Sequence, residues 1–216
     1  MPAPQLFNIA KQFIIDTLLS VFYYSWIGYS YHLNSSTRNN KRFAMDGIDV
    51  VAKLMAISAI TAPKSKGENF VETHVLQGET LKQLADAMAL FGEKTQKKDF
   101  DRDAKNVALS EAVVLVGIKN ATALGLDCGA CGFPDCKTMT SQEKKSVEFK
   151  GPICAFRLLD MGIALGSAVK TASILNVDNR IMYRVGVVAR EMNLVDWDFV
   201  MGIPLSVSGK NIFFDR

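Results

Sequence analysis

The sequence predicts an α+β fold, of the α/β sandwich kind, in which helices cover a sheet. Its strongest strand signal is EAVVLVGI (111–118), a continuous aliphatic run that is typical of a strand buried on both faces. Helical stripes of apolar residues precede and follow this run, at 79–91 and 155–176. The 216 residues suffice for one sizeable domain. Because 49% of them are hydrophobic, the composition excludes a disordered chain and a disulfide miniprotein.

The N-terminal region differs from the rest, so we predict an extension at 1–43 and the domain proper at 44–216. Residues 13–31 are apolar and aromatic, carry Asp16 as their only charge, and are long enough to span a bilayer. An amphipathic helix packed on the domain, or an extension translated ahead of a natural start at Met45, are the alternatives. We predict a cytoplasmic protein, with a membrane-anchored form that faces the cytoplasm as the alternative.

Three elements are predicted before the central strand. A helix at 46–60 ends ahead of Pro63, because the residue before a proline avoids the α region. An alternating strand is predicted at 70–76 and a helix at 79–91, and the charged stretch at 93–105 is predicted to be a loop or a helix end. The first helix has Val50, Val51, Leu54, Ile57 and Ser58 on one face, and the second has Leu81, Leu84, Ala85 and Met88.

Two helices are predicted after the central strand. The segment 155–176 is apolar over most of its length and rich in small residues, which favours a long buried helix. The segment 177–193 follows as a second helix, with Asp178 or Asn179 as its N-cap. Its inward positions are predicted to be Met182, Val185, Ala189 and Met192.

The C-terminal part is predicted to form two short strands, at 198–207 and 211–214. Pro204 has no N–H to donate to a neighbouring strand, so we expect it to interrupt the first of them. The sequence SGK between the two strands is predicted to be a hairpin turn, since it is too short for a phosphate-binding loop.

The net charge argues against one class of partner, and the absence of motifs argues against two classes of enzyme. A net charge of +3 without a long basic run gives no basis for nucleic-acid binding. No Ser/His/Asp set, paired-carboxylate signature or dinucleotide fingerprint supports a hydrolase or a dehydrogenase. The loop at 137–150 carries four lysines against two glutamates. These lysines are expected at a solvated surface, or as cations near a negatively charged metal site.

The four cysteines of the chain all lie in one short stretch, with the spacing C-x2-C-x4-C-x17-C at Cys128, Cys131, Cys136 and Cys154. A secreted disulfide protein distributes its cysteines across the fold, whereas this pattern indicates a metal site in a reducing compartment. Four thiolates approaching from different directions suit a [4Fe–4S] cluster. The Cys-Gly-Ala-Cys-Gly turn brings backbone close to the first two sulfurs, because glycine allows tight conformations.

Other interpretations of the four cysteines stay open. Structural zinc sites usually take their ligands as two spaced pairs, which the x4 and x17 spacings do not form. A thioredoxin-like redox pair would use Cys128 and Cys131 alone, leaving two cysteines without a role. We therefore predict an iron–sulfur cluster with the four cysteines as ligands. A metal that only staples a long loop, without any redox role, is an alternative.

The stretches GLDCGACGFPDC and FKGPIC resemble the four-cysteine [4Fe–4S] domain of the corrinoid iron–sulfur protein and of the B subunit of Rnf-type electron-transport complexes. Together with TAPKSKGENF, DMGIALGSAVK, VDNRIMYRVGVVAR and GIPLSVSGKNIFFDR, residues 45–216 are similar to a bacterial and archaeal family of uncharacterised ferredoxin-domain proteins. This resemblance implies a cluster on the four cysteines. It implies no particular reaction.

The order of elements also resembles the nitroreductase scaffold, a flavin-binding α+β homodimer. This resemblance implies that the cysteine loop is an insertion between the central strand and the long helix, that FMN is an alternative cofactor, and that the chain forms a homodimer. The chain lacks the arginine-rich R-x-x-R start that usually holds the flavin phosphate. The cations considered for a flavin or anion site are Lys64, Lys66, Arg180 and Arg184.

The function predicted from the sequence is electron transfer or redox chemistry with a [4Fe–4S] cluster. The partner would be a redox protein or a small-molecule electron acceptor. An FMN-dependent nitroreductase-like oxidoreductase is the first alternative, and a metal-stapled structural or interaction protein is the second. If the chain is an enzyme, we expect an oxidoreductase, and no catalytic residue can be assigned from the sequence.

Overall fold

A computed structural model of the protein describes residues 47–214. The predicted extension at 1–43, its apolar segment at 13–31 and the predicted domain boundary after residue 43 lie outside the described residues. Within 47–214, no helix combines the length and the apolarity needed to cross a membrane.

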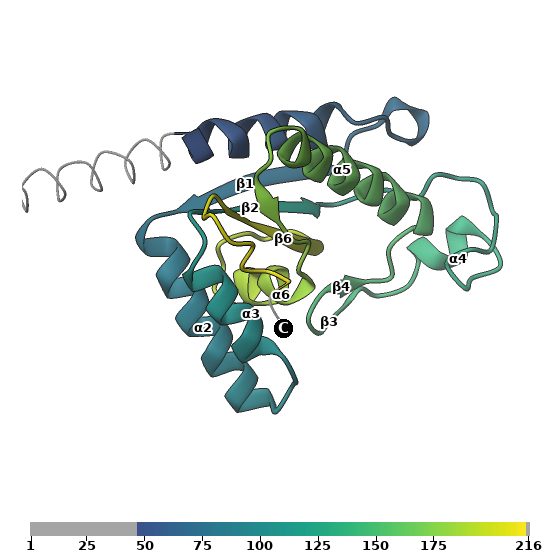
Figure 1. The fold of residues 1–216 in the computed structure, drawn as a ribbon. Coiled ribbons are helices and arrows are strands. Elements are labelled where there is room, and N and C mark those ends of the chain that lie inside the picture. Colours follow the sequence, from purple (N-terminus) through teal and green to yellow (C-terminus); the bar gives the residue numbers. More distant parts are fainter. Residues whose placement is uncertain (1–46, 215–216) are drawn as a thin grey trace, which may run out of the picture. The chain divides into compact units, whose positions relative to one another are not determined.

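A four-stranded antiparallel sheet is the centre of the fold (Figure 1). Its strands lie in the order β1, β2, β6, β5. Their bounds are Val71–Gln77 for β1, Ala112–Ile118 for β2, Phe199–Ser206 for β6 and Asp178–Asn179 for β5. Every residue of β2 is buried, which confirms the strand predicted from the aliphatic run at 111–118. A strand in the middle of a sheet with helices on both faces has no polar side to present.

Helices cover both faces of this sheet and make three layers. One face carries the helix at 47–61 and α5 (Ala155–Ile174), and the other carries α2 (Glu79–Thr95), α3 (Phe100–Ala108) and α6 (Tyr183–Glu191). Successive side chains of β2 point to opposite faces of the sheet. Val114 and Val116 therefore belong to the core under α5, and Val113 and Leu115 belong to the core under α2 and α6. The predicted α+β sandwich is confirmed.

The helix at 47–61 was predicted correctly in its extent but not in its buried face. Pro63 follows its end, as expected. The residues that it buries are Ile48, Ala52, Met55 and Ala59. Of the face predicted from the sequence, Val50 is 55% exposed and Ile57 is 58% exposed. Small Ala52 and Ala59 lie on the buried face, whereas Val50, Leu54 and Ile57 lie on the exposed side.

Helix α2 confirms its predicted stripe, because its buried residues are Leu81, Leu84, Ala85 and Met88. The next helix, α3, was missed, since its charged residues suggested a loop at 93–105. Phe100, Ala104 and Val107 recur at helical spacing on its inner face and join the core with α2 and α6. Three apolar positions are thus enough for a short helix when a larger core lies beneath them.

The segment after α5 also differs from the prediction. Asp178 and Asn179 are not a helix cap but the short strand β5, which pairs with Ser206 and Leu205 of β6. Helix α6 therefore begins later, with Met182 as its N-cap. Its predicted inward residues Val185 and Ala189 are buried.

Strand β6 is continuous through Pro204, contrary to the predicted interruption. Pro204 lies opposite Val113 of β2, and β5 pairs only with the last two residues of β6. The missing N–H of Pro204 therefore removes no bond to β5, which is how a proline is tolerated in a strand. Residues 211–214 are not a strand.

Helix α6 packs directly on the backbone of β6. A Cβ added at Gly186 would lie 1.9 Å from the carbonyl oxygen of Val200, and one added at Gly202 would lie 2.1 Å from Cγ1 of Val185. Both positions therefore require glycine for steric reasons. By contrast, a Cβ at Gly162 in α5 would meet no atom of the described residues within 4 Å.

Gly186→Ala is expected to lower the free energy of unfolding by about 3 kcal/mol, because the added methyl group overlaps backbone that cannot move without shifting β6. Gly162→Ala is the matched control, also a helical glycine, and is expected to change stability by less than about 1 kcal/mol, in the stabilising direction. Urea unfolding followed by circular dichroism measures both. Equal stabilities for the two variants would contradict the close approach of α6 to β6.

Candidate functional site

The four cysteines lie in a segment inserted between β2 and α5. This segment contains little regular structure: α4 (Cys136–Thr140) and a hairpin of β3 (Lys145–Ser146) and β4 (Lys150–Gly151). Leu124, Met139 and Cys154 form a small buried cluster of their own within it. The insertion predicted between the central strand and the long helix is therefore present, with its own packing.

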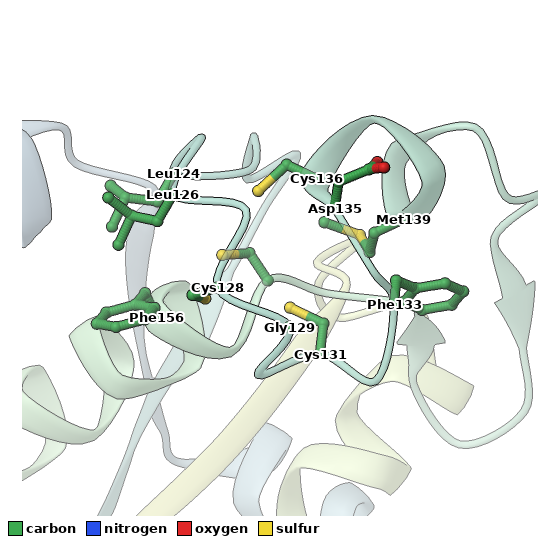
Figure 2. Close-up of a pocket in the computed structure, with 11 residues that line it drawn as sticks. Leu124, Leu126, Cys128, Gly129, Cys131, Phe133, Asp135, Cys136, Met139 and Phe156 are labelled. Carbon is green, nitrogen blue, oxygen red and sulfur yellow. The ribbon is translucent and has the colours of Figure 1, made fainter.

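All four cysteines line one pocket at this place (Figure 2). Their thiols are free, and their exposure grades from buried Cys154 through the intermediate Cys131 and Cys136 to exposed Cys128. Apolar side chains surround them, with Leu126 and Phe156 on one side of the labelled cysteines and Phe133 and Met139 on the other. The pocket therefore combines four soft sulfur donors with a largely apolar wall that is open at one end.

The backbone of the pocket depends on left-handed residues. Gly129 has φ of 71° and Gly132 has φ of 81°, values that L side chains rarely adopt. Between them the N–H of Gly132 donates to the carbonyl of Gly129 at 2.9 Å, which closes a tight turn around Cys131. The glycines next to the first two cysteines thus shape the loop, as the sequence indicated.

Two aspartates organise the part around Cys136. Oδ1 of Asp127 accepts a hydrogen bond from the backbone N–H of Cys136 at 2.8 Å. Oδ1 of Asp135 caps α4 by accepting from the N–H of Thr138 at 2.6 Å, and these hydrogen bonds to Thr138 hold the pKa of Asp135 below its ordinary value. Both carboxylates are thereby used in shaping the loop. Sequence reasoning missed them, although an Asp directly before a short helical run is a recognisable cap signal.

The first turn of α5 directs a backbone N–H at one of the sulfurs. Cys154 is the N-cap of this 20-residue helix, and the N–H of Ala155 donates to Sγ of Cys131 at 3.2 Å. Burial alone raises the pKa of Cys154. Backbone hydrogen bonds from Leu124, Arg157 and Phe156, with one from the thiol of Cys131, outweigh the burial and bring the pKa below its ordinary value. A helix N-terminus favours negative charge, so this geometry stabilises thiolates.

The sulfurs surround a space and do not meet at one point. Within residues 47–214, no three His, Cys, Asp or Glu side chains are grouped as ligands of a single metal ion. The ligands of a cubane cluster bind four separate irons, so they need not converge on one centre as zinc ligands do.

The two lysines considered for a flavin or anion site bind backbone carbonyls. The ammonium of Lys64 donates to the carbonyls of Ala59, Ile60 and Ala62 at the end of the helix at 47–61. Burial lowers the pKa of Lys64, and Asp160 partly offsets this effect. Lys66, in the short 3-10 helix η1 (Ser65–Gly67), donates to the carbonyl of Leu124 at 2.7 Å. Lys66 therefore contacts the cysteine segment, which the sequence did not indicate.

The two arginines considered with them lie elsewhere. Arg180 donates to the carbonyl of Phe213 at 3.0 Å. Arg184 binds Asp103 at 3.0 Å and the carbonyl of Lys98 at 3.1 Å, next to α3. The partners of the four cations thus lie in different parts of the chain, and the proposed flavin or anion role of these residues stays a prediction.

The lysines of the loop at 137–150 are in part tied to the fold. Lys144 pairs with buried Asp198 at 2.9 Å, while Lys137 and Lys145 are exposed. Asp198 also accepts from the N–H of Asn120 at 3.1 Å, so it joins the start of the cysteine segment to its lysine-rich part.

Comparisons with known proteins agree with the predicted family. A family model described as "uncharacterized protein containing a ferredoxin domain (DUF2148)" matches residues 150–216, a part that includes Cys154, α5, α6 and β6. An uncharacterised protein from Archaeoglobus fulgidus is 46% identical over 178 residues, which are 82% of this chain and 96% of the archaeal protein.

Solved structures show the type of scaffold. The FMN-dependent nitroreductase NfnB from Mycobacterium smegmatis, in complex with NADPH, has a TM-score of 0.50 at 11% identity, over 74% of this chain and 78% of the nitroreductase. A variant of an FMN- and NADPH-dependent nitroreductase NfnB from a Sphingopyxis strain has a TM-score of 0.50 at 10% identity, over 78% of this chain and 82% of its own. The fold is therefore nitroreductase-like, as predicted.

In the reduced, metal-free protein, Cys128 is expected to react with iodoacetamide about tenfold faster than Cys154, because Cys128 is exposed and Cys154 is only 4% exposed. Mass spectrometry of peptides after timed labelling measures both rates. The control is the same protein in urea, where the two rates are expected to approach each other. A native Cys154 that reacts as fast as Cys128 would show that the pocket is not formed.

Proposed function

We propose that this chain, which belongs to a family of uncharacterised proteins that contain a ferredoxin domain, binds a [4Fe–4S] cluster through Cys128, Cys131, Cys136 and Cys154 and acts in electron transfer. One observation carries the proposal: all four cysteines of the chain, from a loop and from the start of a long helix, line the same pocket. A set of four thiols is the usual ligand set of such a cluster, which when bound takes up or gives up one electron at a time.

The residues around the thiols suit this group. Thiolates carry negative charge, and the N-terminus of α5 places an N–H donor at Cys131 and has Cys154 as its N-cap. Hydrogen bonds to cluster sulfurs raise the reduction potential, since they stabilise the more negative reduced state. The apolar wall, with Leu126, Phe133 and Phe156, limits the access of water to the same sulfurs.

Exposure supports the transfer of electrons to a partner. Cys128 is exposed at the open end of the pocket, so a redox protein or a small acceptor can approach this ligand without any rearrangement of the fold. We accordingly propose an electron carrier or a redox module as the role of the domain. The partner is left open between a protein and a small molecule.

A mononuclear zinc site is the first rival. It needs sulfurs at about 2.3 Å from one ion, and so a tight tetrahedral group. The arrangement of the thiols around an apolar pocket, with a backbone donor at one of them, favours the cluster instead.

A flavin-dependent oxidoreductase is the second candidate, because the fold is nitroreductase-like. The cations considered for its phosphate, such as Lys64 and Arg184, already donate to carbonyls or carboxylates of the chain. No side chain of the described residues therefore supports FMN as directly as the cysteines support iron. The flavin hypothesis also predicts a homodimer, so measurements of flavin content and molecular mass together test this hypothesis.

Protein purified without oxygen is expected to be brown, with about four irons and four sulfides per chain, and to bleach with dithionite. Metal analysis, sulfide assay and visible spectroscopy of one sample measure this. A colourless protein that contains one zinc would overturn the cluster. A yellow extract whose flavin fluoresces after denaturation, from a protein of dimeric mass, would establish the second candidate.

Cys131→Ser is expected to reduce the iron content from about four atoms per chain to less than about one, because a hydroxyl is a poor replacement for a thiolate ligand. Ser141→Ala is the matched control in the same segment, since Ser141 is exposed and only donates to the carbonyl of Thr138. It should keep its iron. Unchanged iron in Cys131→Ser would remove Cys131 from the ligand set.

A further inference from the structure

Arg157 is the largest of the fully buried side chains, with 1% of its surface exposed. It lies in the first turn of α5, three residues after Cys154. A buried guanidinium is costly unless its N–H groups find acceptors. Its Nε donates to the carbonyl of Thr122 at 3.1 Å, and Nη1 donates to the carbonyl of Ser65 at 3.1 Å. One side chain thus joins three segments that are far apart in the sequence.

Carboxylates and an aromatic ring complete the surroundings of Arg157. Its guanidinium contacts Asp160 at 3.3 Å and also Glu68, and it lies 4.6 Å from the ring centre of Phe70. Asp160 is itself buried, and its Oδ1 accepts from both the N–H and the hydroxyl of Ser65 at 2.8 Å. Such a network, with its polar groups satisfied, specifies one arrangement of the segments that it joins.

The segments that Arg157 joins lie at the border of the cysteine pocket. Thr122 lies at the start of the cysteine segment, and Arg157 itself lies just after its end. Two residues beyond Thr122, Leu124 lines the pocket and packs in the same buried cluster as Cys154. The carbonyl of Leu124 accepts a hydrogen bond from the ammonium of Lys66. Lys66 directly follows Ser65, whose carbonyl accepts a hydrogen bond from Arg157. The loop around Ser65 therefore braces the cysteine segment from outside.

We infer that Arg157 is a positioning residue that fastens the two ends of the cysteine segment and so places the N–H of Ala155 at the sulfur of Cys131. The planar guanidinium reaches acceptors in several directions from a fixed fork, whereas a lysine is a single point charge on a flexible stem. The placement of the thiols does not depend on the proposed function. The effects on a bound cluster do rest on it.

Hydrogen exchange in the iron-free protein tests the placement directly. In Arg157→Lys, the amide of Ala155 is expected to exchange about tenfold faster, because it loses its ordered acceptor, the sulfur of Cys131. The matched control is Arg184→Lys, which also removes a guanidinium bound to a carbonyl and a carboxylate but lies next to α3. It should leave the Ala155 amide unchanged. Equal protection of Ala155 in wild type and Arg157→Lys overturns the inference.

Loss of the buried network could unfold Arg157→Lys, which circular dichroism would reveal. In that case Lys66→Met takes its place, since it removes the contact to the carbonyl of Leu124 and leaves the buried ion pair intact. It is expected to accelerate exchange at Ala155 but not in the strands of the sheet. Unchanged exchange at Ala155 in Lys66→Met then overturns the inference.

The iron-loaded protein gives a second readout. Arg157→Lys is expected to lose iron to a chelator about tenfold faster than wild type and to show a lower midpoint potential, because hydrogen bonds to the sulfurs weaken. Arg184→Lys should match wild type in both. A loaded Arg157→Lys with unchanged potential and iron loss overturns the inference alone. A wild type that holds no iron refutes the proposed function, and the exchange experiment on the iron-free protein still decides the inference.

Discussion

Helix α5 is the element on which both the core and the cysteine pocket depend. Its inner face packs on the sheet through Met161, Ala164, Ala168 and Ala172, which fixes the helix axis against β2 and its neighbours β1 and β5. Its first turn then lies at the edge of this core, where Cys154 caps the helix and the N–H of Ala155 reaches Cys131. Because a helix is rigid over such a length, burial at one end determines where the N–H groups at the other end point. The position of the pocket is thus a consequence of core packing.

Two groups of polar contacts surround the first turn of α5. Backbone hydrogen bonds lower the pKa of the Cys154 thiol and so favour the thiolate form. Farther from the sulfurs lies the buried ion network of Arg157 and Asp160. This network orients the chain segments more than it stabilises the fold, because desolvation offsets much of the attraction between such charges. Lys66, first considered as a cation for a flavin phosphate, donates a hydrogen bond to the carbonyl of Leu124 near this network. A residue that looks like an anion ligand in the sequence therefore supports the loop in the fold.

The scaffold and the candidate site are formed by different parts of the chain. The sheet with helices on both faces is nitroreductase-like, and this likeness speaks for the fold alone. The cysteines lie in the segment inserted between β2 and α5, which has its own small buried cluster. A scaffold can host unrelated chemistries, so function has to be argued from the inserted segment and its ligand set. For this chain the ligand set favours iron, and the family to which it belongs is consistent with that choice.

The sequence by itself determined the elements whose burial pattern is local. The aliphatic run of β2, the stripe of α2 and the long α5 are visible because every buried position repeats at a fixed period, and the cysteine spacing identified the four thiols as one group. Only the tertiary structure decided which face of the helix at 47–61 is buried, that Asp178 and Asn179 pair with β6, and that Pro204 is tolerated in a strand. It also decided the contacts of Gly186 and Arg157. These features depend on contacts between residues distant in the chain, and no local period encodes which distant backbone will lie against a given side chain.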